Sequence, residues 1–358
     1  GNALAGTPVG TALASISAQV TVQVISRVTA ANLVGDLLYD VTAFAPSGPG
    51  ATTALNTDGA SHGVFTSLMY APNSAGGMDV LVADAAKGQI VRYKAGSTTS
   101  TPVWSYGYGG GPAHPDGLSL DADGNLFIVT SQLSDRTNSS VWVLPASTGS
   151  ATGFASAPLL IDSSCDGRGI QLLRETVVAT TNTTAWSVGD LLVLVGNASG
   201  NEYYSDHNAT NAEVFVYKRS TIMKVIATHS PVAQPDRVLM APQQFPSLEF
   251  PVGMDFWPTT DSLSNQPTLL ISTNLGRILR YDFSSGAPKL VQVFASGLGL
   301  GLQKVKVGQQ AGVAYAFASQ IVRFNGGRIL KLGAPTQGTN LIGIAVTNRA
   351  ADGLAVTH

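Results

Sequence analysis

Cysteine and charge are both scarce in this chain of 358 residues. The single cysteine, Cys165, excludes a disulfide within the chain, and Asp166 beside it disfavours the thiolate that a cysteine nucleophile needs. Charged residues are only 12% of the sequence, about half of the usual share. A surface with so few charges must be built largely from Ser, Thr, Asn and Gly.

Several classes of function are excluded by what else is missing. The net charge is -2 and the basic residues are scattered, so no stripe for nucleic acid or an anionic membrane is present. No apolar run reaches the roughly 18 residues of a membrane-inserted helix. Gly-x-Ser-x-Gly, His-Glu-x-x-His and Cys-x-x-Cys motifs are absent. The glycine-rich stretches 107–111 and 297–301 lead into strand patterns rather than helices, which disfavours nucleotide binding.

The polar, lysine-poor composition favours an extracellular or periplasmic protein. The start of the chain lacks the basic residue and apolar core of a signal peptide, as a mature end left after cleavage would. Four sites fit the N-glycosylation sequon, and in a chain rich in Ser and Thr about that many arise by chance: Asn138, Asn182, Asn197 and Asn208.

Glycine is abundant, with 39 residues, and no long segment carries a helical period, so an all-β chain is predicted. Residues 114–130 show the organising pattern. Pro115-Asp-Gly117 is a turn signal, Leu118 and Leu120 alternate with polar residues, Asp123-Gly124 marks a tight hairpin, and an apolar run follows at 126–129. The stretch predicts a turn, a strand, a hairpin and a second strand. Residues 121–125 are faintly similar to a calcium loop but lack its distal Glu, so a hairpin is preferred.

This pattern recurs. Turn-Gly-apolar starts place glycines at 63, 117, 169, 253, 301 and 343, which by subtraction are 54, 52, 84, 48 and 42 residues apart. Apart from the third interval, this is the period of four-stranded propeller blades. Second and third strands follow the first five starts, and three third strands share the form Ile-Val/Leu-Arg-aromatic, at 90–93, 278–281 and 321–324.

The sequence therefore predicts one domain over residues 1–358, a six-bladed β-propeller. The sixth unit is incomplete at the C-terminus, and strands at 18–25 and 37–44 are expected to complete it, which removes exposed edges. Seven blades, or a pair of β-sandwiches, are the alternatives. The long third interval predicts an insertion at 196–211, and long loops in compact domains are usually functional or disordered.

The repeats resemble the NHL and gluconolactonase-like six-bladed propellers. Residues 115–129 are similar to the gluconolactonase line with P-D-G followed by D-x-x-G-N-L, and residues 82–90 are similar to the NHL line V-A-D … G-x-I. The lactonase resemblance implies that Asp116 ligates a divalent cation such as calcium. Val252 stands where that family has an Asn ligand, and its Glu ligand has no clear match.

Residues just before the six glycines are predicted to ring the central channel: His62, Asp116, Arg168, Val252, Leu300 and Ile342. His62 and Asp116 could hold a metal, or Asp116 could pair with Arg168, and an ion pair is preferred. His114 is a further candidate at the channel mouth. Tyr203, Tyr204 and Trp257 are candidates for stacking on a sugar or a partner.

The preferred prediction is a secreted, non-catalytic propeller without a cofactor, whose loops bind a partner protein or a glycan. The alternative is a metal-dependent lactone or ester hydrolase centred on Asp116 and His62.

Overall fold

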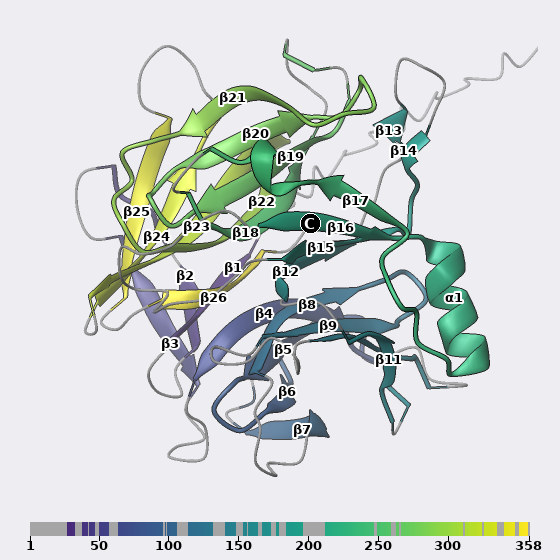
Figure 1. Ribbon diagram of the computed structural model, residues 1–358. Coiled ribbons are helices and arrows are strands. Elements are labelled where there is room, and N and C mark those ends of the chain that lie inside the picture. The colour runs from purple at the N-terminus through teal and green to yellow at the C-terminus, as the bar shows by residue number, and fades with distance from the viewer. Residues whose placement is uncertain are drawn as a thin grey trace, which may run out of the picture.

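The computed structural model describes residues 27–32, 38–41, 43–46, 50–56, 64–95, 97, 99–105, 114–131, 140–147, 153–155, 157–163, 167–172, 177–178, 184–195, 212–246, 249–258, 263–264, 266–310, 312–323, 326–334, 340–347 and 351–356. These residues form six four-stranded antiparallel sheets arranged around a common axis (Figure 1). The predicted six-bladed propeller is confirmed, and the resemblance to NHL and gluconolactonase-like propellers is confirmed as architecture.

The blades are numbered here in chain order, each from its inner to its outer strand. Blade 1 comprises β4 (Phe65–Pro72), β5 (Met78–Asp84), β6 (Gln89–Tyr93) and β7 (Ser100–Ser105). Blade 2 comprises β8 (His114–Leu120), β9 (Leu126–Ser131), β10 (Ser140–Leu144) and β11 (Leu159–Asp162). Blade 3 comprises β12 (Gly167–Leu172), β15 (Leu191–Val195), β16 (Glu213–Tyr217) and β17 (Arg237–Met240).

Blade 4 comprises β18 (Pro251–Trp257), β19 (Thr268–Thr273), β20 (Ile278–Asp282) and β21 (Lys289–Ala295). Blade 5 comprises β22 (Leu302–Gln310), β23 (Val313–Arg323), β24 (Gly326–Leu332) and β25 (Leu341–Thr347). Blade 6 comprises β26 (Ala351–Val356), β1 (Val28–Asn32), β2 (Leu38–Val41) and β3 (Thr52–Asn56). A separate two-stranded sheet joins β13 (Val177–Val178) to β14 (Thr184–Trp186).

Blade 6 closes the ring with strands from both ends of the chain. The C-terminal β26 pairs with β1, placing Val28 opposite Val356 and Ala30 opposite Leu354. The mixed last blade is confirmed, and β2 falls within the strand predicted at 37–44. The other predicted strand, at 18–25, lies outside the described residues, as does the predicted insertion at 196–211. Because β1, β2 and β3 all serve blade 6, the described N-terminal strands form no seventh blade.

The prediction was wrong about where blade 5 ends. Residues 313–317 and 320–324 were predicted as two strands, but β23 runs unbroken from Val313 to Arg323. The strand containing Ile342 is therefore the outer strand of blade 5, not the inner strand of blade 6. The inner strand of blade 6 is β26, where Asp352-Gly353-Leu354 repeats the Asp116-Gly117-Leu118 of blade 2.

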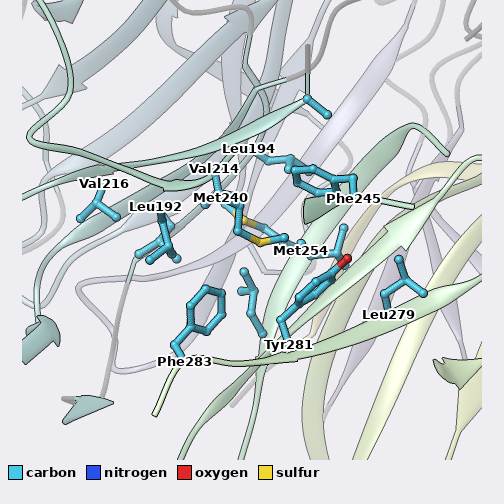
Figure 2. Packing of buried hydrophobic residues seen from close by; sticks show 14 residues of the cluster. Leu192, Leu194, Val214, Val216, Met240, Phe245, Met254, Leu279, Tyr281 and Phe283 are labelled. Carbon is cyan, nitrogen blue, oxygen red and sulfur yellow. The ribbon is translucent and has the colours of Figure 1, made fainter. Parts of the chain in front are cut away.

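The core is a set of apolar layers between neighbouring blades. Strand β15 is buried at all five positions because its two faces pack on different blades. Between blades 3 and 4, Leu192 and Leu194 of β15 meet Met254 of β18, with Tyr281 and Phe283 close by (Figure 2). Each blade thus buries both faces and cannot leave the ring without exposing two layers.

The repeated glycine of the inner strands allows the blades to approach closely near the axis. A Cβ on Gly253 would lie 2.9 Å from both the Gln303 carbonyl oxygen and the Lys304 Cα of blade 5. A Cβ on Gly117 would lie 3.0 Å from Ile170 of blade 3. The glycine that marks the sequence repeat is therefore a packing requirement.

A helix that the sequence reading missed lies between β16 and β17. This helix, α1 (Arg219–Thr228), buries Ile222 and Val225 against blade 2. The returning chain donates the Val232 N–H to the Ile161 carbonyl oxygen of β11 at 2.8 Å. The segment between β16 and β17 therefore covers the outer edge of blade 2. A short 3-10 turn, Pro242–Gln244, precedes blade 4. Within the described ranges no helix has the length and apolar character to cross a membrane.

Candidate functional site: the propeller axis

Every inner strand carries one extra residue near its start. The pairing with the second strand shifts between Pro115 and Gly117 in β8 and between Pro251 and Gly253 in β18, and the other four inner strands shift at the corresponding place. Bulges re-aim side chains and often border functional sites. Together they place a ring of residues at one end of the axis: Thr66, Asp116, Arg168, Val252, Gln303-Lys304 and Asp352-Gly353.

Asp116 and Lys304 form an ion pair across this ring. The Lys304 ammonium, from blade 5, lies 3.0 Å from the Asp116 Oδ1 of blade 2 and donates to the Asp116 carbonyl oxygen, also at 3.0 Å. Blades 2 and 5 are opposite one another in a ring of six, so the lysine spans the axis. The side chains are only 10% and 12% exposed. A carboxylate buried to this extent requires a compensating cation, and Lys304 provides it.

The neighbouring contacts hold Lys304 in this position. The Ser319 hydroxyl of β23 accepts the Lys304 backbone N–H at 3.1 Å. Two residues further along β22, the Lys306 ammonium donates to the Gln171 Oε1 of blade 3 at 3.0 Å. Two lysines of a single strand therefore reach across the axis to two different blades. They fasten the inner ends of blades 2, 3 and 5 together.

The predicted ring is partly correct. Asp116, Arg168 and Val252 occupy three of the bulges. Leu300 and Ile342 do not: Leu300 precedes β22 and is 71% exposed, and Ile342 lies on the outer strand β25. The error arises because the glycine repeat does not continue into blade 5, which has Lys304 where blades 2, 3, 4 and 6 have glycine. The repeat of Asp-Gly-Leu at 352–354 was the sequence signal that could have corrected it.

The two histidines of the prediction are placed differently. His62 lies outside the described residues. His114 was predicted in the loop that enters blade 2, but it is the first residue of β8, opposite Ser131. Arg168 has a strand position at the bulge of β12, one blade from Asp116. Lys304 is a cation that contacts Asp116 and that the sequence reading did not identify. The pairing of Asp116 with Arg168 stays a prediction.

The residues at Asp116 do not fit the divalent cation that the lactonase resemblance implies. The ammonium of Lys304 is bonded to the carboxylate that would be the first ligand, and a fixed cation there repels a metal ion. Val252 has no donor atom at the position of the family's Asn. In the part of the chain that the structure describes, no three His, Cys, Asp or Glu side chains gather closely enough to hold a metal.

The aromatic candidates also require a correction. Trp257 was predicted to be available for stacking, but it is only 2% exposed and meets the Phe294 ring edge-on, with centroids 4.7 Å apart. It ends the inner strand of blade 4, where the blade 4–5 layer buries it. Tyr203 and Tyr204 lie outside the described residues, as do Asn138, Asn182, Asn197 and Asn208. Those sites stay predictions.

The D-x-x-G-N-L line of blade 2 has a structural role. Asp121 accepts the Asn125 backbone N–H at 2.7 Å, and Gly124 has φ 86°, so residues 121–125 form the predicted hairpin turn. The Asn125 Oδ1 then accepts the Ala146 N–H at 3.0 Å. Asp79 and Asp190, at the same position of blades 1 and 3, accept the N–H groups of Ala95 and Arg219. The motif therefore joins the first hairpin of a blade to the end of its third strand.

Among the residues that the structure describes, three ionisable side chains have a pKa that their surroundings shift. Burial raises the pKa of Tyr281 to about 12, opposed by the nearby Arg277 guanidinium. Burial raises the pKa of Glu213 and lowers the pKa of Lys331. The Lys331 ammonium lies over the rings of Tyr315, 4.0 Å from its centroid, and Phe44. None of the three lies at the bulge ring.

Comparison with known proteins supports the fold and nothing finer. No protein-family model matches the chain, and no curated protein matches it. A chain in a nidogen/laminin complex is similar in structure, with a TM-score of 0.54 at 13% identity, over 93% of this chain and 98% of that chain. A puromycin hydrolase (TM-score 0.46, 14% identity, 90% of this chain and 54% of that one) is also similar. So is a protein provisionally assigned as a gluconolactonase (TM-score 0.44, 15% identity, 81% of each chain). At these identities the shared feature is the propeller fold alone.

Proposed function

We propose that this chain is a non-catalytic β-propeller that binds a partner protein or a glycan through its loops. The observation that carries the proposal is the Asp116–Lys304 ion pair at the axis. A hydrolase of the lactonase type needs a carboxylate free to hold a cation that polarises a carbonyl and acidifies water. Here the best-matched carboxylate is neutralised by an ammonium from the same chain, so the centre of the ring is used for stability.

The loops at the bulged end of the axis offer an ordered surface for binding. Leu300 is 71% exposed, and its carbonyl oxygen accepts a hydrogen bond from the Gln320 side chain at 3.0 Å. Gly301 accepts the Ile321 N–H at 2.8 Å, so the turn before β22 is fixed on both sides. Leu275, in the β19–β20 turn, is 43% exposed. This turn lies close to the turn that contains Leu300, because the Leu298 N–H donates to the Gly276 carbonyl oxygen. Rigid, exposed apolar groups bind a partner at low entropic cost.

A secreted or periplasmic location belongs to the same proposal. It is supported by the charged share of 12% and by the polar, lysine-poor composition. The similar chain in the nidogen/laminin complex supports only the protein-binding part of the proposal, because it occurs in a complex between proteins.

The test is binding to a panel of immobilised glycans and extracellular proteins, measured with the full chain and two variants. We expect a ligand whose binding is lost when a short Gly-containing turn replaces residues 196–211. We expect the same ligand to bind Asp116→Asn normally, because the Asp116 side chain is only 12% exposed and is paired with Lys304. The contrary result is divalent-dependent hydrolysis of a lactone or ester that the Asp116→Asn variant loses. That outcome would establish the hydrolase alternative.

A further inference from the structure

We propose that a single water molecule binds between Glu249 and Thr273 and joins the segment that enters blade 4 to the β19–β20 turn. The inference concerns two buried oxygen atoms and does not rest on the proposed function. The Glu249 side chain is only 3% exposed, and Thr273 is 1% exposed. The Glu249 Oε2 and the Thr273 Oγ1 have no hydrogen-bond partner among the described residues. A buried polar atom without a protein partner is usually satisfied by bound water.

The pairing of the strands places both side chains on one face of blade 4. Thr273 lies opposite Pro251 of β18. The pairing continues one position further, because the Asn274 N–H donates to the Phe250 carbonyl oxygen at 2.9 Å and the Asn274 Oδ1 accepts the Phe250 N–H at 2.7 Å. Side chains alternate along an extended chain, so Glu249 shares the face of Pro251 and Thr273.

Arg277 lies on the same face, on the other side of Thr273. Ser272 pairs with Ile278, and the Thr273 N–H donates to the Arg277 carbonyl oxygen at 2.9 Å, so Thr273 and Arg277 are opposite each other at the turn. The Arg277 guanidinium forms an ion pair with the Glu249 carboxylate. Because Thr273 belongs to the middle one of these three segments, the ion pair spans its side chain. The two unpaired oxygen atoms are therefore neighbours.

These two oxygen atoms require a small, neutral hydrogen-bond donor. A carboxylate oxygen only accepts hydrogen bonds, whereas a hydroxyl both donates and accepts. The two groups make no direct hydrogen bond, so a water molecule that donates to the Glu249 Oε2 and accepts from the Thr273 hydroxyl satisfies both. A metal ion fits less well, because the Arg277 guanidinium already neutralises the carboxylate and repels a second cation.

The water molecule links two segments at the bulged end of the axis. The β19–β20 turn carries Leu275, which is 43% exposed. The same turn contacts the segment before β22, because the Gly276 carbonyl oxygen accepts the Leu298 N–H at 3.2 Å. A water molecule held by Glu249 and Thr273 therefore fixes this turn to the start of blade 4 from its buried side.

The first test is a crystal structure of the full chain at a resolution that shows ordered water. We expect one density peak within about 3 Å of both oxygen atoms, the usual length of a hydrogen bond. Thr273→Ser keeps the hydroxyl and should keep the peak, whereas Thr273→Val should lose it. The proposal is wrong if the unmodified chain has no peak, or if the peak contacts only one of the two oxygen atoms. It is also wrong if the contacts are near ~2.4 Å, as calcium would make.

Thermal melting tests the same site through the sign of a change. Valine has nearly the shape of threonine. If the Thr273 hydroxyl had no ligand, Thr273→Val would remove an unsatisfied polar atom, and the melting temperature would stay constant or rise. With the water bound, the substitution removes one of its two partners, and we expect the melting temperature to fall by about 1–3 °C. A Thr273→Val variant that melts at or above the temperature of the unmodified chain would contradict the proposal.

Discussion

Lys304 does at the axis what a bound cation would otherwise do, because it neutralises Asp116 from the opposite side of the ring. Among the residues that the structure describes, blades 2 and 5 share no apolar layer, so this pair links them directly. The cost of desolvating both groups is met by mutual attraction and by the bond to the Asp116 carbonyl oxygen.

Removing one member should therefore be much worse than removing both. We expect Lys304→Met to lower the free energy of unfolding by about 3 kcal/mol, since it leaves a buried carboxylate unpaired. The Asp116→Asn/Lys304→Met double variant should recover most of that loss. Urea unfolding followed by circular dichroism measures both.

The surface pair Arg219–Asp123 is the matched control, with side chains 56% and 53% exposed. Asp123→Asn should cost less than about 1 kcal/mol. Equal losses for Asp123→Asn and Lys304→Met would mean that the axial pair is no stronger than a solvated one.

Tyr281 gives a pH dependence at the residue scale. Its hydroxyl donates to the Gln244 carbonyl oxygen at 3.1 Å, and burial raises its pKa to about 12. The unfolded chain ionises this tyrosine near pH 10. The stability that the neutral Tyr281 hydroxyl contributes to the folded state is thus fully present below pH 10 and is lost as the pH rises toward 12. Melting temperatures of the unmodified chain and of Tyr281→Phe should converge over that range, and a constant difference would contradict the assignment.

At the scale of elements, the inner strands decide how closely the blades pack. Gly253→Ala would force a Cβ to within 2.9 Å of the backbone of Gln303 and Lys304. We expect a loss of about 1–3 kcal/mol, the usual cost of overpacking. Gly326→Ala is the control, because nothing lies within 4 Å of its added Cβ. Similar unfolding midpoints in urea for the two variants would show that the close approach is relieved cheaply.

The sequence predicted the elements whose pattern is local. Turn-Gly-apolar starts identified the inner strands of blades 2, 3 and 4, because the bulge and the close approach both require a particular residue type. It missed α1, whose ten residues have two buried side chains and too little periodicity to stand out. It also divided β23 in two, because the polar Ser319 and Gln320 in the middle of the strand resemble a turn. In the structure both side chains make hydrogen bonds to residues distant in the sequence, which allows them to lie within a buried strand.

The candidate site was harder to predict for a related reason. Asp116 was identified through its motif, but its partner is 188 residues away in the chain. No local pattern links the two, and only the closed ring brings blade 5 opposite blade 2. Sequence alone therefore found one half of the axial pair and assigned the other half to Arg168 or a metal.

At the scale of the whole molecule, closure depends on blade 6. Deleting residues 1–44 removes β1 and β2 and exposes the edge of β26. We expect loss of the cooperative melting transition or assembly into large oligomers, because an open ring exposes strand edges and apolar layers. Deleting residues 1–26 leaves β1 whole and is the control, with a transition expected at the temperature of the full chain. A cooperative transition that survives both deletions would contradict closure by the N-terminal strands.

The central claim is that the axis holds an internal ion pair in place of a catalytic metal. Titration calorimetry with Ca²⁺ and Zn²⁺ on the purified, dialysed chain tests it most directly, with Asp116→Asn as the comparison. The account predicts no binding tighter than about 1 mM for either ion, because the Lys304 ammonium occupies the carboxylate. Stoichiometric binding of either ion to the unmodified chain, abolished in Asp116→Asn, would contradict it.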